Sequence, residues 1–337
     1  MRWKLLLGLL VLSVAAAQLP SQAQTDLIAS AEKEGVVILY STLPSEFAAI
    51  VAERFNQAYP KIKVEWIRGS TSSMVQRYLT EVQARRVQVD VISHNDVGIF
   101  QEWAKTGLLR RYQSPGARFY PAGLGGGEYW TPFRAISTVI SYNTRHVAAR
   151  PTSMKDLLDP KYKGRISMLD PRTAGDALAF YYAIRNTLGV EYWRRMAQQG
   201  VEFQTSVGRV ADQVSAGEKW IGLNADYRVV FSRDVEGAPI GVVWPAEGTV
   251  AIPTPVAITA RGPHMNAAKV LYDWLLSNRG QQIVIKDLKQ LSVRVGAGKT
   301  AGIPPIQAMK LLRVDFDALN KERNDVLKEF SEIFGLR

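Results

Sequence analysis

The sequence predicts an α/β protein built from two doubly wound lobes, and three observations lead to this fold class. Short apolar runs that are typical of buried strands alternate with helical patterns, which indicates parallel sheets covered by helices. Glycine and proline interrupt this alternation at residues 115–132. The length of 337 residues also exceeds one typical domain. We therefore expect a first lobe before the interruption and a second lobe after it.

Three apolar runs predict the parallel strands of the first lobe. Pro60 ends the helix that follows the first strand, and Asp96 is a suitable N-cap for the helix that follows the third. The expected strands span residues 36–40, 62–66 and 89–93. The expected helices span residues 47–58, 74–82 and 97–103.

Further runs of the same kind predict the second lobe and the return of the chain. Residues 170–175 follow one of these strands and form a helix start. The expected strands span residues 138–142, 165–169, 220–223, 240–244 and 256–259. Helices are expected over residues 265–277 and, as a charged amphipathic region, over residues 314–334.

The composition excludes several kinds of site. Apolar residues make up 47 % and charged residues 22 % of the chain, which is ordinary for a folded soluble protein. The absence of cysteine excludes disulfides, thiolate metal sites and cysteine nucleophiles. With only three histidines, we expect no multi-histidine zinc site. We expect no resident cofactor.

The first 23 residues have the three parts of a secretory signal peptide. Arg2 and Lys4 form the charged start, residues 5–17 form the apolar run, and small residues that fit a cleavage site follow. This run is short for a membrane span. We expect cleavage near Gln18 or Gln24. Because the chain has no cysteine for lipid attachment, we expect it to be free in the periplasm.

The net charge points to the kind of partner. A formal charge of +11 suggests nucleic acid, a membrane surface or an anionic ligand. An exported protein is a poor candidate for binding nucleic acid. We therefore expect a small anionic solute and no nucleic-acid partner.

Candidate ligand residues of the first lobe follow the ends of its strands, where doubly wound sheets bind their ligands. Thr42 follows the first strand, and Asn95 follows the third. Ser70, Thr71 and Ser72 offer hydroxyls and free backbone N–H groups at a helix start, which suits phosphate or carboxylate. Capping of the helix alone is the alternative, because a cap needs only one hydroxyl.

The second lobe offers its own candidates at equivalent places. Arg172 and Thr173 open a helix, and an arginine can bind a carboxylate or phosphate through two parallel hydrogen bonds. The alternative is a helix cap with a solvated arginine. Asp226, Tyr227 and Glu247 follow two later strands and complete the predicted ligand site.

The order of these pieces resembles that of the solute-binding proteins of bacterial ABC importers. The likeness is to the branch that contains ferric-ion, thiamine, polyamine, phosphonate and sugar-phosphate binders. Residues 153–164 are its most specific piece. It is also carried by residues 34–40, 55–60, 89–91, 170–171, 247–249 and 267–281.

The resemblance implies the periplasmic binding protein-like II fold, in which two crossing segments join two lobes that clamp the ligand. It implies a first lobe of residues 24–133 and 253–283, and a second lobe of residues 134–252 and 284–337. It also implies an ABC permease in the inner membrane as a partner and no catalysis. We expect a monomer.

Ferric members of this family hold iron with a histidine after the first strand, a glutamate after the third strand and two adjacent tyrosines. Here no histidine follows the first strand, Asn95 stands about where the glutamate belongs, and Asp226-Tyr227 corresponds to the tyrosine pair. Ferric iron prefers several anionic oxygen donors. We therefore expect no metal site, with Tyr227 and Asp226 as the candidate ligands if iron binds.

Together these observations predict a binding protein that delivers a phosphonate, phosphate ester or carboxylate to a permease. A ferric-ion or ferric-chelate binder is the alternative within this class. A secreted two-lobed enzyme is the alternative from another class. Against an enzyme, the chain has no G-x-S-x-G elbow, no H-E-x-x-H pattern and no P-loop.

Overall fold

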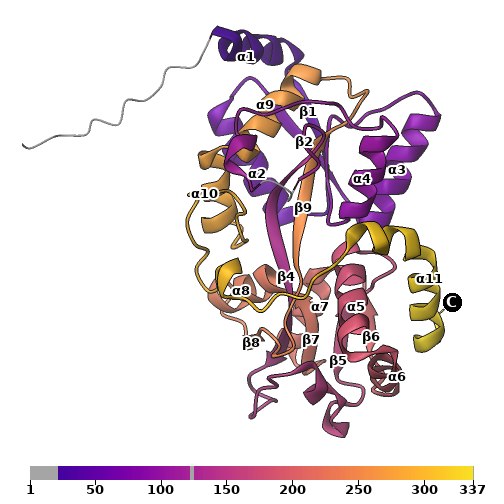
Figure 1. The fold of residues 1–337 in the computed structure, drawn as a ribbon. Coiled ribbons are helices and arrows are strands. Elements are labelled where there is room, and N and C mark those ends of the chain that lie inside the picture. The colour runs from indigo at the N-terminus through magenta and orange to yellow at the C-terminus, as the bar shows by residue number, and fades with distance from the viewer. Residues whose placement is uncertain (1–21, 122–124, 337) are drawn as a thin grey trace, which may run out of the picture.

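The computed structural model describes residues 22–121 and 125–336, which form two α/β lobes (Figure 1). Two long strands, β4 (Thr131–Asn143) and β9 (Ala251–Ile258), pair antiparallel and run from one lobe into the other. This arrangement confirms the predicted α/β class with two lobes and two crossing segments. The predicted signal peptide lies almost entirely outside the described residues.

The first lobe has a sheet in the order β2-β1-β3-β9. Its first three strands are parallel, and β9 is antiparallel to β3. These strands are β1 (Val36–Ser41), β2 (Lys63–Arg68) and β3 (Val91–Ser93). The helices of this lobe are α1 (Gln22–Glu34), α2 (Ser45–Ala58), α3 (Thr71–Gln83), α4 (Val97–Lys105), α9 (Met265–Leu276) and α10 (Asn278–Lys286).

The second lobe has a sheet in the order β4-β7-β5-β6, with β8 on the other side of β4. Its strands are β5 (Ile166–Leu169), β6 (Glu202–Gln204), β7 (Ile221–Ala225) and β8 (Ile240–Val243). Its helices are α5 (Gly175–Leu188), α6 (Val190–Gln198), α7 (Val207–Ala216), α8 (Asp226–Asp234) and α11 (Phe316–Phe334). Short 3₁₀ turns are η1 (Ala117–Phe119), η2 (Met154–Leu158), η3 (Pro160–Tyr162) and η4 (Ile306–Ala308).

Local sequence signals explain where two helices of the first lobe begin. The Ser70 side chain accepts a hydrogen bond from the Ser73 backbone N–H at 3.2 Å and caps α3. The Asp96 side chain accepts one from the Ile99 N–H at 3.2 Å and caps α4. Such caps satisfy N–H groups that have no partner within the helix.

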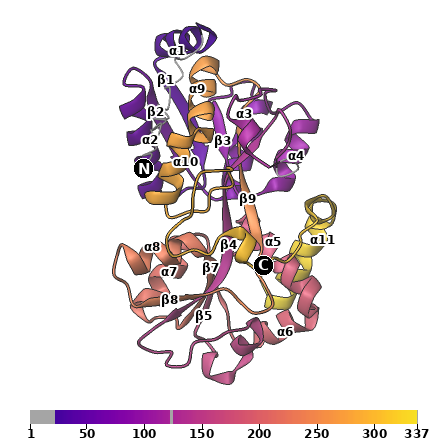
Figure 2. The ribbon, with the colours of Figure 1, turned by 60° about the vertical axis from the view of Figure 1, so that its left-hand side comes forward.

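The two lobes touch each other across the cleft, so the structure is a closed form. Phe47 of α2 packs against Tyr227 and Phe231 of α8, with ring centroids 5.7 and 5.1 Å apart. Arg323 of α11 places its Nη2 2.6 Å from Asp96 Oδ2 at the start of α4. Helix α11 lies along one flank of the molecule, where it reaches from the second lobe to the first (Figure 2).

The predicted lobe boundaries fall within helices and strands of the structure. The boundaries after residues 133 and 252 fall inside the crossing strands β4 and β9. The boundary after residue 283 falls inside α10. In the described part of the chain, no helix is long and apolar enough to span a membrane.

Candidate functional site

A cavity lies between the lobes, at the carboxyl ends of strands from both. Its empty space is about 370 Å³, a figure that includes the open solvent at its mouth. From the first lobe it is lined by Thr42, Arg68, Gly69, Ser70, Thr71 and Asn95. From the second lobe it is lined by Leu169, Thr173, Ala174, Asp176, Thr205, Ser206, Val207 and Tyr227. This is the position at which open α/β sheets bind their ligands.

The structure brings six of the ten predicted site residues together around this cavity. They come from five separate parts of the chain, and their role as ligand contacts stays a prediction. These six residues are Thr42, Ser70, Thr71, Asn95, Thr173 and Tyr227.

The other four predicted residues do not line the cavity. Ser72 is exposed, and its Oγ lies 3.0 Å from the Ser70 Oγ. The Nη2 of Arg172 donates to Asp170 Oδ2 at 2.8 Å, so the guanidinium folds back onto its own turn. The role of all four residues as ligand contacts stays a prediction.

Asp226 and Glu247 have partners within the protein. The buried Asp226 carboxylate accepts a hydrogen bond from the Ser137 hydroxyl at 2.6 Å. Glu247 accepts one from the Ser153 hydroxyl at 2.5 Å and one from the Met154 N–H at 3.0 Å, so it holds the start of η2. These contacts are within the second lobe, and none of the residues that form them lines the cavity.

Helix N-termini surround the cavity in the described part of the chain. Helices α3, α5, α7 and α8 each begin at or next to residues that line it. The first N–H groups of a helix have no intrahelical partner, and the helix dipole makes this end positive. The arrangement therefore favours a negatively charged group inside the cavity.

Arg134 is the main residue of the site that sequence reasoning missed. It is the fourth residue of the crossing strand β4 and is only 1 % exposed. Its Nη2 donates to the cavity-lining Asn95 Oδ1 at 3.5 Å, and its guanidinium carbon lies 5.9 Å from the centroid of the Tyr227 ring. Its Nε and Nη1 have no hydrogen-bond partner. The signal that could have revealed it is a charged side chain within the otherwise apolar run of residues 133–136.

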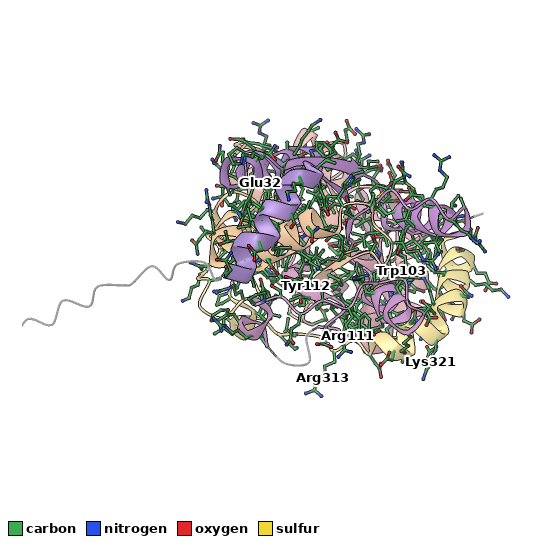
Figure 3. All side chains as sticks on the ribbon, turned by 90° about the horizontal axis from the view of Figure 1, so that it is seen from above. Glu32, Trp103, Arg111, Tyr112, Arg313 and Lys321 are labelled. Carbon is green, nitrogen blue, oxygen red and sulfur yellow. The ribbon has the colours of Figure 1, made fainter. Side chains whose placement is uncertain are left out.

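The position of this arginine differs from that of the surface cations. Arg313 and Lys321 are exposed and project outward from the molecule (Figure 3). Burial of Arg134 lowers its pKa from the ordinary value, although an arginine keeps its charge. Burying a cation whose N–H groups are only partly hydrogen-bonded costs free energy. Arg134 lies behind the lining residues Asn95 and Tyr227, and its charge favours an anion inside the cavity.

Two further polar atoms next to the cavity are buried without a partner. They are Thr42 Oγ1, from the first lobe, and Asp176 Oδ1, from the second. Asp176 is 3 % exposed, and burial raises the pKa of its carboxyl. Buried polar groups usually have hydrogen-bond partners. Unpartnered atoms from both lobes at one cavity therefore indicate a ligand-binding site.

The environment of Tyr227 affects whether it could bind ferric iron. Burial raises the pKa of the Tyr227 phenol well above its ordinary value, so it stays neutral. Burial also raises the pKa of the adjacent Asp226 to about 6. Among the described residues, no group of three or more histidine, cysteine, aspartate or glutamate side chains could hold a metal ion. A neutral phenol beside the Arg134 cation suits Fe³⁺ poorly.

Comparison with known proteins agrees with this geometry. Residues 88–321 match the family model described as bacterial extracellular solute-binding protein. An uncharacterized protein of Haemophilus influenzae is 26 % identical over 304 residues, which cover 86 % of this chain and 87 % of that protein.

Two further similarities concern proteins whose names state a ligand. A putative 2-aminoethylphosphonate-binding periplasmic protein of Salmonella paratyphi A is 24 % identical over 65 % of this chain and 66 % of its own length. The fold is similar to that of the periplasmic binding protein AfuA from Actinobacillus pleuropneumoniae with fructose-6-phosphate bound. That comparison has a TM-score of 0.82 at 22 % identity and covers 90 % of this chain and 100 % of that one.

Proposed function

The chain belongs to the bacterial extracellular solute-binding proteins, and from that premise we propose that it captures a small anionic solute between its lobes for an ABC importer. The observation that carries the anionic part is the buried guanidinium of Arg134, whose Nε and Nη1 have no partner beside the interlobe cavity. We propose that the solute is a phosphonate, a phosphate ester or a carboxylate. The protein binds this solute and performs no chemistry on it.

The donors around the cavity support an oxyanion. Thr42, Ser70 and Thr71 offer hydroxyls from the first lobe, and helix N-termini offer N–H groups from both lobes. Arg68 adds a second cation at the cavity. Hydrogen bonds between charged donors and oxyanions are about twice as strong as neutral ones. The names of two similar proteins, which state a phosphonate and a sugar phosphate, also support this class.

Delivery depends on closure of the lobes. A ligand that contacts residues of both lobes binds the closed form better than the open form, so it shifts the population toward the closed form. We propose that this closed, loaded form is what the permease in the inner membrane recognises. The signal peptide proposed at residues 1–23 exports the chain, which acts in the periplasm as a monomer without a lipid anchor.

A thermal-shift screen followed by calorimetry tests the proposal. The panel contains phosphonates, phosphate esters, carboxylates, polyamines, thiamine and ferric citrate. Because a ligand that binds only the folded state raises the melting temperature, we expect shifts with oxyanions alone. A shift with polyamines or thiamine alone would contradict the anionic reading. Unchanged ligand after long incubation with the protein distinguishes binding from turnover.

X-ray scattering in solution tests closure with whichever anion shifts the melting temperature. We expect the radius of gyration to fall when the protein is saturated, because both crossing strands allow the lobes to move as units. An unchanged radius of gyration at saturation would count against a clamping mechanism.

A further inference from the structure

Asp176 is a buried carboxylate in the cavity wall that anion binding by itself does not explain. It lies in the first turn of α5 and lines the cavity from the second lobe. Burial raises the pKa of its carboxyl, and the nearby Asn95 side chain and Ala177 backbone N–H partly offset this effect. Its Oδ1 is nevertheless buried without a partner. An acceptor oxygen is thus held in place for a donor that the protein does not supply.

The nearest buried cation does not neutralise this oxygen directly. Arg134 interacts with Asp176 through space, but among the described residues it forms no ion pair within 4.0 Å. The charge of Arg134 also interacts with the buried carboxyl group of Asp226. At neutral pH, one buried cation therefore faces two buried carboxyl groups.

This balance of charges restricts the ligand. A purely anionic solute would bring its charge next to Asp176, where like charges repel. A positive group on the same solute would offset that repulsion and satisfy Oδ1. A carboxylate that is buried and already oriented binds a cation more strongly than it would in water.

We propose, on the basis of the proposed function, that Asp176 binds an ammonium group of the solute, so that the natural ligand is a zwitterion. Its anionic end, a phosphonate, phosphate ester or carboxylate, lies against Arg134 and the start of α3. Its primary amine lies against Asp176 Oδ1 at the start of α5. Each lobe thereby holds one end of the solute, and closure requires both ends.

Calorimetry with three matched phosphonates tests this inference. The probes are 2-aminoethylphosphonate, 2-hydroxyethylphosphonate and propylphosphonate, which differ in the group that meets Asp176. Matched amine, hydroxyl and methyl analogues of a phosphate monoester and of a carboxylate repeat the comparison for the other headgroups. We expect the amine to bind about 10- to 100-fold more tightly than either analogue, as for other charge-assisted hydrogen bonds.

The variant Asp176→Asn then assigns the preference to this residue. We expect it to lose most of the preference for the amine and to bind the methyl analogue more tightly than the unmodified protein does, because the repulsion between Asp176 and the anionic headgroup is removed. Asp325→Asn, which removes an exposed carboxylate on α11, is the matched control and should keep the preference. The selectivity of the unmodified protein remains a test if Asp176→Asn does not fold.

The outcomes separate this inference from the proposed function. If the amine and its analogues bind equally well, or the hydroxyl compound binds best, the anion site stands and the ammonium site is overturned. If Asp176→Asn keeps the full preference for the amine, another group recognises the ammonium and the assignment fails. If none of the headgroups binds, the proposed function fails and this inference fails with it.

Discussion

The imidazole of His94 predicts a specific dependence of folding stability on pH. It is fully buried beside the cavity residue Asn95, and its ring packs against Phe100 at a centroid distance of 4.4 Å. Its Nδ1 accepts a hydrogen bond from the Asp96 backbone N–H at 3.2 Å, which requires an unprotonated nitrogen. Burial lowers the pKa of His94 from 6.5 to about 4. His94 is therefore a structural residue that the fold keeps neutral.

The size of the effect follows from proton linkage. Because the pKa of His94 is lower in the folded state, the unfolded chain binds the proton more readily, and stability falls as the pH falls. The contribution is fully present above about pH 6.5 and is lost by about pH 4. At about 1.4 kcal/mol per pH unit, this difference amounts to about 3 kcal/mol.

Another buried group changes stability in the opposite direction. Burial raises the pKa of Asp226 from 3.8 to about 6, so the folded state holds this proton more tightly. Its contribution is fully present below about pH 3.8 and is lost as the pH rises through about 6. The two effects overlap, so the stability curve of the unmodified protein alone cannot isolate His94.

Urea unfolding of the unmodified protein and of His94→Asn, at several pH values from 4 to 7, isolates the effect. The asparagine keeps a short acceptor for the Asp96 N–H, and the cost of its smaller volume does not depend on pH. We expect the stability advantage of the unmodified protein to shrink by about 3 kcal/mol between pH 7 and pH 4. Unchanged m-values are the control for comparable unfolding. Parallel curves for the two proteins would refute the reasoning.

Three further predictions concern the site and its closure. Arg134→Lys should weaken binding of the anionic ligand about 10- to 100-fold in calorimetry, because a lysine cannot reproduce the planar guanidinium; unchanged affinity would exclude Arg134 as an anchor. Arg323→Ala removes the ion pair to Asp96 between α11 and α4, so ligand dissociation measured by stopped-flow should be a few times faster. An unchanged dissociation rate would show that this ion pair does not stabilise the closed form. Ferric citrate should give no visible absorption band with the protein, whereas a coloured band that Tyr227→Phe abolishes would restore an iron site.

The order of strands and helices could be predicted because the signals for it are local. The apolar run before residue 41 becomes β1, and Pro60 follows the end of α2 as expected. Ser70 and Asp96 cap α3 and α4. Each side-chain oxygen accepts a hydrogen bond from the backbone N–H three residues later. Such contacts depend on nearest neighbours along the chain, so sequence reasoning can find them without knowing the fold.

The site could be predicted only as far as strand ends define it. Thr42, Asn95 and Thr173 were placed at the correct edge of the sheets, because parallel strands bring their carboxyl ends together. The direction of each side chain was not predictable in this way. Arg172 stands at such an end, yet its guanidinium pairs with Asp170 within the same turn.

Sequence alone determined the fold class of this protein, which is two α/β lobes with their strand ends facing a common cleft. It could do so because hydrophobic periodicity and helix caps are properties of short segments. Tertiary structure alone decided which charges meet in that cleft. Arg134 lies within a strand, away from its carboxyl end, and it reaches the site only because β4 crosses from one lobe to the other. Asp176 faces it from a helix 42 positions along the chain. Their juxtaposition depends on how the two lobes pack together, which no local pattern of residues encodes.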